Sequence, residues 1–500
     1  MIRLAVERQS IIRALTVVSI LLLALAVRLY QIELQVVWFD EAYSVWLSRM
    51  PPTQVILFTA RDVHPPLYYL LLHVWMYCWG DSVVAVRSLS AVIGVATVAM
   101  GMRIAHQFGC WRTSAMAGLL LAVFPIGVYY SQETRMYALL GLLMLSALYA
   151  VLLWGRQQRQ RYLLAYSLLM VAGLYTHYFA ILCALSCWLY VLLARGQNGR
   201  LLICSGPWWI YNLGIALAFL PWLPTLIEQT GRPNLIAWIA AVTPMTVPLA
   251  FLRAFTLDTN MAGASLLAVA FSLTLLAGAT RLWSRDHALS RPGSMLVIYC
   301  FIPVLATWLV SSVKPLFMER YLLFALLGLP ILLASALAEL RQRWRVLLLV
   351  LCVFFEAAGM VNLYSRQFNL RGGSEWVDNR LDYVMAQVNS RWLQGDALLA
   401  DDRVWSLTID FYNKTGTAPL VYKPYYTDPA IALYPRVAQR VVNDPRTLEH
   451  RYKRVWWVTS GPVTEIERTM MRNWVSLAAI SKGDSRALLF AMPDQAASRD

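Results

Sequence analysis

Ionisable and amide side chains gather in five short segments, each beside a long apolar stretch of the chain. The segments are WFDEAYS, RDVHPPLYY, YYSQETRMY, YTHYF and MERYLL. Their polar residues of interest are Asp40, Glu41, Asp62, His64, Gln132, Glu133, Arg135, His177, Glu319 and Arg320. Polar groups at membrane depth are costly and tend to be functional. Together these carboxylates, histidines and arginines would suit acid–base chemistry on a substrate that carries a phosphate.

The adjacent carboxylates Asp40 and Glu41 are the predicted catalytic pair. Such a pair after an apolar segment can act as a general base or bind a cation. Here a carboxylate would deprotonate an acceptor hydroxyl or amine. The alternative is structural, with Asp40 serving only as the N-cap of a helix over 41–50.

Positive groups in the other segments could neutralise a departing phosphate. The predicted phosphate ligands are His64, Arg135 and Arg320. An arginine at a helix start opposes the helix dipole, so Arg320 suggests a bound anion, although it could also reach lipid phosphates. His64 could instead hydrogen-bond a headgroup, and Arg135 could pair locally with Glu133.

A bound divalent ion could share the neutralising role, and Mg²⁺, Mn²⁺ and Zn²⁺ are all considered. Its predicted ligands are Asp40, Asp62 and His64. The remaining polar residues of the five segments are predicted to contact substrate: Asp62, Gln132, Glu133, His177 and Glu319.

The elements that position these residues are predicted to be membrane spans. Of the 500 residues, 59% are apolar and 14% are charged, whereas soluble domains carry about 25% charged residues. The apolar blocks approach the roughly 20 residues that cross a bilayer. Eleven such blocks occur, at about 11–32, 83–105, 113–130, 136–154, 162–176, 178–194, 208–228, 262–280, 294–313, 321–340 and 346–364.

The distribution of arginines predicts the orientation of these spans in the membrane. Thirteen of them fall in five short loops, one after every second span. By the positive-inside rule these loops and the N-terminus are cytoplasmic, and the five polar segments and the C-terminus lie outside. The net charge of +15 is thereby explained without a nucleic-acid partner. We expect a multi-pass protein of the plasma (inner) membrane, surrounded by lipid.

Two outer regions complete the predicted architecture. The segment 33–82 would form an outer loop with helices at 40–50 and 66–79, the second lying in the membrane interface because it has only about 14 apolar residues. A stretch at 236–255 could also be interfacial. Residues 365–500 alternate helix-like and strand-like runs, which predicts a small extracytoplasmic α/β domain. The predicted division is thus 1–364 and 365–500.

In this order, WFDEAYSVWLSR, DVHPPLYYLLLHVW, YYSQETRMYALL, YTHYFA and PLFMERYLL resemble motifs of the GT-C glycosyltransferases of family 39. This family includes the protein O-mannosyltransferases and the lipid A aminoarabinose transferases. The resemblance covers roughly residues 15–340. It implies an inverting transfer from a polyprenyl-phosphate sugar, with Asp40 as the base and Arg320 as a ligand of the donor phosphate.

The chain departs from the family at two positions. The aminoarabinose transferases have Glu-Lys before the proline where this chain has Val63–His64, which puts a metal role carried over from them in doubt, although Asp62 could substitute. Members often have an Asp in the next outer loop, where this chain has Gln132–Glu133. These departures leave the sugar, and equally the acceptor, undefined.

The leading hypothesis is therefore an enzyme that moves a sugar from a polyprenyl-phosphate donor to a lipid, glycan or protein at the outer face. One rival is a transporter or flippase of lipid-linked sugars, which predicts charged residues near mid-membrane and related halves. The other is a glycan polymerase or ligase that uses lipid diphosphates, which predicts several outer arginines and no Asp-Glu pair.

Overall fold

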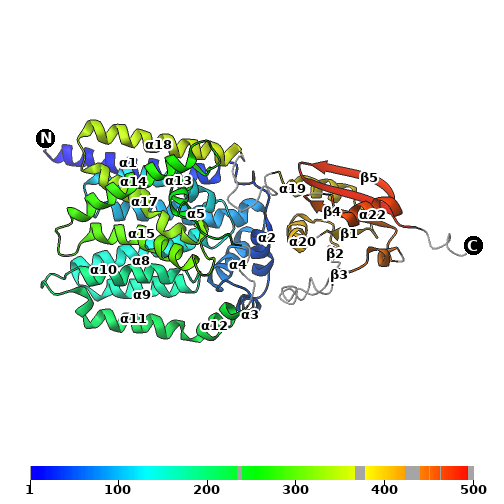
Figure 1. Ribbon diagram of the computed structural model, residues 1–500, viewed down its shortest axis with the longest axis horizontal. Helices are drawn as coiled ribbons and strands as arrows, with labels where there is room; N and C mark the ends of the chain where they lie inside the picture. Colours follow the sequence, from blue (N-terminus) through cyan, green and yellow to red (C-terminus); the bar gives the residue numbers. More distant parts are fainter. Residues whose placement is uncertain are drawn as a thin grey trace, which may run out of the picture. The chain divides into compact units, whose positions relative to one another are not determined.

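The computed structural model describes residues 2–232, 239–365, 378–401, 403–422, 440–449, 451–461 and 463–493. The chain divides into two compact units. Unit 1 comprises Met1–Ile32 and Pro52–Phe368, and unit 2 comprises Glu33–Pro51 and Asn369–Asp500. Figure 1 shows helices throughout unit 1 and the strands confined to unit 2.

Unit 1 is built from helices, most of whose long members run in one common direction (Figure 1). Its helices are α1 (Ile2–Leu29), α3 (Pro52–Ala60), α4 (Leu67–Trp79), α5 (Val83–Ala105), α6 (Trp111–Val123), α7 (Pro125–Ser131), α8 (Tyr137–Gln157), α9 (Gln160–Leu174), α10 (Ala180–Leu193), η1 (Leu202–Cys204), α11 (Gly206–Phe219), η2 (Leu220–Trp222), α12 (Leu223–Gly231), α13 (Thr246–Thr256), α14 (Ala264–Ser284), α15 (Pro292–Ser311), η3 (Glu319–Leu322), α16 (Leu323–Leu326), α17 (Gly328–Ala338) and α18 (Gln342–Ser365).

Helices occupy all eleven predicted apolar segments, which confirms a polytopic helical membrane protein. Among the described residues, eight helical stretches are long and apolar enough to cross a membrane, and a ninth is the bent pair α6–α7. The two remaining segments correspond to α9, with 15 residues, and α10, with 14. These are shorter than the roughly 20 residues of a full span. Helix α4, predicted to be interfacial, has only 13 residues.

The bend between α6 and α7 has a local cause. Pro125 has no N–H to continue the backbone hydrogen bonds of α6, and the preceding Phe124 is held in an extended conformation (φ −64°, ψ 108°). The two helices therefore meet at 57°. The bend leaves carbonyl groups at the end of α6 without partners inside that helix.

Arg28 of α1 supplies those partners. Its Nη1 donates to the Ala122 carbonyl at 2.9 Å and its Nη2 to the Leu121 carbonyl at 3.3 Å. In return the amide of Gln132, just after α7, donates to the carbonyl of Arg28 at 3.0 Å, at the end of α1. The Arg28 guanidinium and the Gln132 amide, here called the α1–α7 clamp, hold the break rigidly.

Gly94 of α5 makes room for this clamp. A Cβ at position 94 would lie 2.2 Å from Oγ of Ser131 and 2.6 Å from Nε of Arg28. These two atoms are themselves hydrogen-bonded at 3.2 Å. Only glycine fits here without displacing the arginine, so the bend, the clamp and the small residue depend on one another.

Unit 2 is an α/β unit, as predicted for the C-terminal region. Its elements are α2 (Phe39–Ser48), α19 (Leu381–Arg391), β1 (Ala397–Ala400), α20 (Arg403–Tyr412), β2 (Leu420–Tyr422), β3 (Val441–Val442), η6 (Pro445–Leu448), β4 (Arg454–Ser460), α22 (Glu465–Asn473), β5 (Val475–Lys482) and β6 (Ser485–Ala491). The six strands form one sheet in the order β3-β2-β1-β4-β6-β5. Strands β1 to β4 pair in parallel, and β6 pairs antiparallel with both β4 and β5.

The central strands are buried on both faces, which explains their continuous apolar runs. Alternate residues of β4 enter two separate apolar clusters, with Trp456 in one and Val455 in the other. Val36 belongs to the first cluster. The predicted division at 364/365 placed residues 33–51 in the membrane domain, whereas the contacts group them with the C-terminal unit because Val36 lies in its core.

Candidate functional site

Two histidines and two tyrosines of unit 1 form a compact aromatic cluster. The rings of His64 and His177 have centroids 5.0 Å apart. Tyr321 lies 4.9 Å from His177, and Tyr137 lies 6.2 Å from Tyr321. The structure thus brings together residues from four of the five polar segments, separated by more than 250 positions in the chain.

Helix ends position every member of this cluster. His64 lies in the bend between α3 and α4, and His177 in the turn between α9 and α10. The two connections are tied because the N–H of Leu67, the first residue of α4, donates to the Tyr175 carbonyl at 3.0 Å. Tyr137 begins α8, and Tyr321 lies in η3. Because these side chains lie at the ends of packed helices, their positions are fixed without the entropic cost of ordering a long loop.

Two guanidinium groups adjoin the rings. Arg135 lies over the Tyr137 ring, 5.9 Å from its centroid, and donates to the Tyr69 hydroxyl at 3.3 Å. Arg320 lies over the Tyr321 ring at 5.5 Å. Both arginines are at most 5% exposed. Both guanidinium groups are therefore largely shielded from solvent beside the aromatic cluster.

His177 is neutral and offers a proton to this region. Its Nδ1 accepts the backbone N–H of Phe179 at 3.1 Å, so the ring proton of the neutral form is on Nε2. Burial, together with the positive charges of Arg135 and Arg320, lowers the pKa of His177 to about 3. Nε2 is buried and has no hydrogen-bond partner among the described residues. A buried N–H beside two arginines fits an acceptor oxygen of an anion.

His64 has the same electrostatic surroundings. Burial lowers the pKa of His64 well below its usual 6.5, and the charge of Arg135, the neighbouring His177 and the charge of Arg320 act in the same direction. The ring is therefore neutral at physiological pH. All three predicted phosphate ligands (His64, Arg135 and Arg320) thus lie in one region, and His177, predicted only as a substrate contact, joins them.

The other predicted substrate contacts have identifiable neighbours. Glu133 is buried, and it lies in electrostatic range of Tyr130, as do Arg320 and Glu319. Glu319 forms an ion pair with Arg253 of α13, Oε1 to Nη1 at 2.6 Å. Gln132 belongs to the α1–α7 clamp. Glu319 and Gln132 therefore stabilise the fold around the site.

Asp62 lies on the edge of a hydrogen-bonded group that connects α9–α10 to α12. The Tyr178 hydroxyl donates to Oε1 of Gln229 at 2.5 Å and accepts from Nε1 of Trp222 at 2.9 Å. Burial raises the pKa of Tyr178 to about 12; the bond from Trp222 opposes this shift, and the charge of Asp62 adds to it. Asp62 is thereby placed near Tyr178.

The carboxylates Asp40 and Glu41 lie on α2, in unit 2. Helix α2 begins at Phe39, its N-cap is Trp38, and no side chain caps it. Asp40 therefore lies in the first turn and is not the N-cap, contrary to the structural alternative. Both carboxylates interact favourably with the N-terminal end of the helix dipole, and Glu41 is fully buried.

The described residues contain no group of three His, Cys, Asp or Glu side chains that could hold a metal ion. At His64 the positive charges of Arg135 and Arg320 act against binding of a further cation. The groups around His64 fit an anion better than a metal ion. Asp40, the third predicted ligand, belongs to unit 2.

Sequence reasoning missed several residues of the site. Tyr137 and Tyr321 follow closely after Arg135 and Arg320, so the patterns Arg-Met-Tyr and Arg-Tyr were the available signal. Arg253 and Gln229 had no comparable signal, because they lie in the outer region that was interpreted only by its hydropathy.

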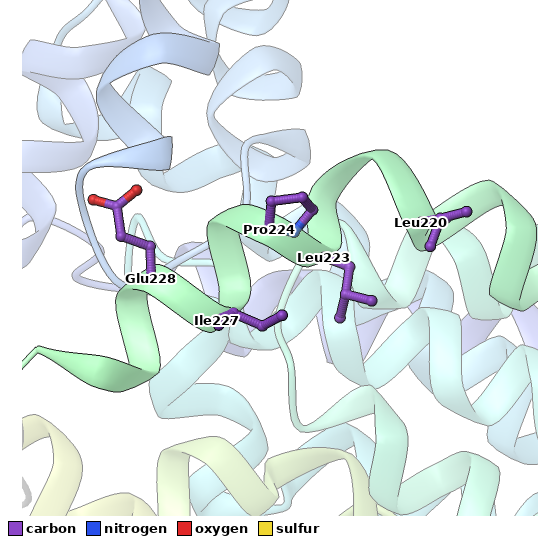
Figure 2. Close-up of a pocket in the computed structure, with 5 residues that line it drawn as sticks. All are labelled: Leu220, Leu223, Pro224, Ile227 and Glu228. Atoms are coloured by element: carbon purple, nitrogen blue, oxygen red, sulfur yellow. The ribbon is translucent and has the colours of Figure 1, made fainter.

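An apolar groove of about 510 Å³ lies elsewhere on unit 1, on η2 and α12. Figure 2 shows its lining residues Leu220, Leu223, Pro224, Ile227 and Glu228 along one side of these helices. None of the predicted site residues lines it. Its apolar character is that of a span facing lipid.

Comparisons with known proteins identify a sequence family and solved structures that this chain resembles. Residues 63–227 match the sequence model described as dolichyl-phosphate-mannose-protein mannosyltransferase. No curated protein matches the chain. The crystal structure of ArnT from Cupriavidus metallidurans in the apo state superposes with a TM-score of 0.63 at 16% identity, covering 97% of this chain and 98% of that one. Its complex with undecaprenyl phosphate gives the same values.

The archaeal oligosaccharyltransferase AglB from Archaeoglobus fulgidus, solved with an inhibitory peptide and a dolichol-phosphate, is also similar. Its TM-score is 0.53 at 11% identity, with 90% of this chain and 70% of that chain covered. The chain therefore has the fold of the GT-C glycosyltransferases, and the resemblance to the family 39 type is confirmed in the region of the sequence match.

Proposed function

We propose that this chain, which has the GT-C fold, is a glycosyltransferase that moves a sugar from a polyprenyl-phosphate donor to an acceptor at the outer membrane face. The observation that carries the proposal is the buried cluster of His177, His64, Arg135 and Arg320, in which Nε2 of His177 has no hydrogen-bond partner among the described residues. The solved relatives bound to undecaprenyl phosphate or dolichol-phosphate support the same ligand class.

The reaction assigned to these residues is a single displacement. Asp40 takes the proton from the acceptor hydroxyl or amine as the acceptor atom bonds to the anomeric carbon. The bond from that carbon to the phosphate oxygen breaks, and its electron pair leaves with the polyprenyl phosphate. Attack from the side opposite the phosphate inverts the anomeric centre. Glu41 is the second carboxylate of the proposed catalytic pair.

This cluster of histidines and arginines stabilises the departing phosphate. Negative charge develops on the phosphate as the sugar leaves, and fixed donors in a buried site act on it more strongly than water would. The two guanidinium groups supply charge, and Nε2–H of His177 supplies a neutral donor. Because both histidines stay neutral, the site does not add further positive charge that would trap the product.

The test is transfer of labelled sugar from a polyprenyl phosphate in nanodiscs. We expect transfer by the wild type, and loss of at least about 100-fold in Asp40→Asn, on the scale of general-base catalysis. Undecaprenyl phosphate should still bind to Asp40→Asn. No transfer by the wild type from any polyprenyl-phosphate sugar would overturn the proposal.

The flippase hypothesis has one observation in its favour. Glu356 lies inside the span α18, is fully buried, and neither carboxylate oxygen has a hydrogen-bond partner among the described residues. Intramembrane carboxyl groups often mark transport pathways. Release of a lipid-linked sugar to the opposite leaflet without glycosidic cleavage would favour this second function.

The outer location of the site is part of the proposal. Cysteine labelling tests it at Lys414→Cys, an exposed position in unit 2, in a background lacking the exposed Cys78, Cys110 and Cys204. Reaction with an impermeant reagent in intact cells is expected. Labelling only after permeabilisation would reverse the assigned topology.

A further inference from the structure

Residues 33–51 and residues 369–500 form one compact unit although more than 300 residues separate them. The first segment carries Asp40 and Glu41, and the second carries the six-stranded sheet. Three contacts of different kinds join them. Each of these contacts is made within unit 2.

The first contact is apolar. Val36, three residues before α2, is 7% exposed and belongs to the cluster on one face of the sheet. That cluster contains Leu381 and Val384 of α19, Ile409 of α20 and Trp456 of β4. The chain that leads into α2 is thus anchored inside the hydrophobic core of the C-terminal domain, not on its surface.

The second contact is a hydrogen bond. The backbone N–H of Val37 donates to the hydroxyl of Tyr412, the last residue of α20, at 3.0 Å. Val37 is fully buried, so loss of the hydroxyl would leave a buried donor unsatisfied. The bond fixes the chain two residues before Phe39, where α2 begins.

The third contact continues along α2 itself. Helix α2 packs on α20. Arg49, which follows α2, lies in electrostatic range of Asp410 of α20. The beginning and the end of the carboxylate-bearing helix are therefore both held by the same helix of the C-terminal domain.

We propose that the C-terminal domain positions the catalytic carboxylates, with Val36 and Tyr412 as positioning residues that hold α2 in the register that the reaction needs. This inference rests on the proposed function of Asp40. It assigns the domain a part in catalysis that does not depend on any acceptor contact. The phosphate site of unit 1 should work independently of it.

The test separates turnover from donor binding. In Val36→Ala, we expect kcat for sugar transfer to fall at least about tenfold while the Kd for undecaprenyl phosphate changes less than about twofold. Tyr412→Phe, which keeps the ring, should behave in the same way. Val36→Ile, which restores apolar contact, should retain most of the turnover.

Val455→Ala is the matched control. Val455 is fully buried in the same domain, but it lies in the cluster on the other face of the sheet. The same chemical change there destabilises the domain without touching the anchor of α2. Equal loss of kcat in Val36→Ala and Val455→Ala at equal thermal destabilisation would overturn the proposal.

A second readout does not need activity. Amide hydrogen exchange over residues 39–48 should accelerate roughly tenfold in Val36→Ala and Tyr412→Phe and stay unchanged over α4 of unit 1. Unchanged exchange over 39–48 would contradict the anchoring itself. If exchange accelerates but the wild type transfers no sugar, the anchoring stands and the proposed function fails.

Discussion

The backbone N–H of Phe179 donates to Nδ1 of His177 at 3.1 Å, and this bond leaves Nε2 as the donor nitrogen of the ring. With Nδ1 occupied as an acceptor, Nε2 carries the proton. A histidine in this tautomer binds a phosphate oxygen as a neutral donor. The bond is local, between residues two positions apart, so the turn after α9 sets the chemistry of the site.

Replacing His177 by Phe is expected to weaken phosphate binding. The ring shape is kept but the Nε2–H donor is lost, which should raise the Kd for undecaprenyl phosphate about tenfold, or about 1.4 kcal/mol. His106→Phe, an exposed histidine at the end of α5, is the control and should bind normally. Fluorescence or calorimetric titration in nanodiscs measures both. An unchanged Kd in His177→Phe would remove it from the site.

Neutralising Arg320 should have a larger effect. In the proposed mechanism Arg320 stabilises the leaving phosphate, so loss of this buried charge in Arg320→Gln should lower kcat/KM by roughly 30-fold to 1,000-fold, or about 2–4 kcal/mol. Arg161→Gln removes one exposed charge at the start of α9 and controls for net charge. Comparable losses in the two variants would indicate a general electrostatic effect and contradict phosphate binding by Arg320.

The two buried histidines predict that the protein loses stability in acid. Their folded pKa values lie below the unfolded value of about 6.5, so the unfolded chain takes up protons first as pH falls. The stabilisation is complete above pH 6.5 and declines below it, by about 1.4 kcal/mol per pH unit for each histidine, until the folded pKa is reached. Thermal unfolding at pH 7.5 and 5.0 measures this decline.

The variant that tests this assignment is the double substitution His64→Phe and His177→Phe. Its loss of stability between pH 7.5 and 5.0 should be smaller than that of the wild type, whatever its stability at pH 7.5. An identical loss would mean that other groups carry the acid sensitivity.

The place of Gln132 in the α1–α7 clamp predicts that this residue stabilises the fold and does not bind substrate. Gln132→Ala removes the amide that caps the end of α1 and should destabilise the protein by about 1–2 kcal/mol. Because the amide is engaged with backbone carbonyls at 2.9 and 3.0 Å, KM for the donor should stay within about twofold. A raised KM with an unchanged Tm would restore the predicted role in substrate binding.

Replacing Glu356 is expected to stabilise the protein, whereas replacing Gln132 is expected to destabilise it. Replacing this buried carboxyl by Met, an apolar side chain of similar length, should raise the unfolding temperature, since burying a polar group without a hydrogen bond costs about 1–3 kcal/mol. Sugar transfer should be unchanged. A stable Glu356→Met protein that has lost activity would assign this residue a function and strengthen the transport hypothesis.

Transfer should persist in EDTA. The region around His64 holds two arginines, which supply the positive charge that a divalent ion would otherwise provide. Activity abolished by EDTA and restored by Mg²⁺, Mn²⁺ or Zn²⁺ would show that a metal ion binds elsewhere on the protein.

The sequence was informative where one physical constraint dominated. Bilayer thickness makes spans such as α5 and α8 readable as apolar blocks, and the cost of polar groups at membrane depth pointed to His64, Arg135 and Arg320. The segments of the short helices α9 and α10 were predicted as spans too, because hydropathy does not show whether a helix is long enough to cross the membrane.

The remaining features depend on pairs of residues that only the fold brings together. Nothing near Gln132 in sequence indicates that its amide caps α1, and nothing near Glu319 indicates Arg253. Val36 reads as part of a loop after the first span, and its place in the core of unit 2 follows from residues more than 340 positions later. Long-range partners of this kind leave no local periodicity.

The anchoring of Val36 also bears on how the protein is made. Residues 33–51 leave the ribosome early, but the core that receives Val36 includes Ala487 and Leu489. At synthesis rates of roughly 5–20 residues per second, the first outer loop would wait about 20–90 s for its partner strands. During that interval the newly translocated loop is exposed to proteases and chaperones, and the nascent enzyme should have no activity until its last strand is in place.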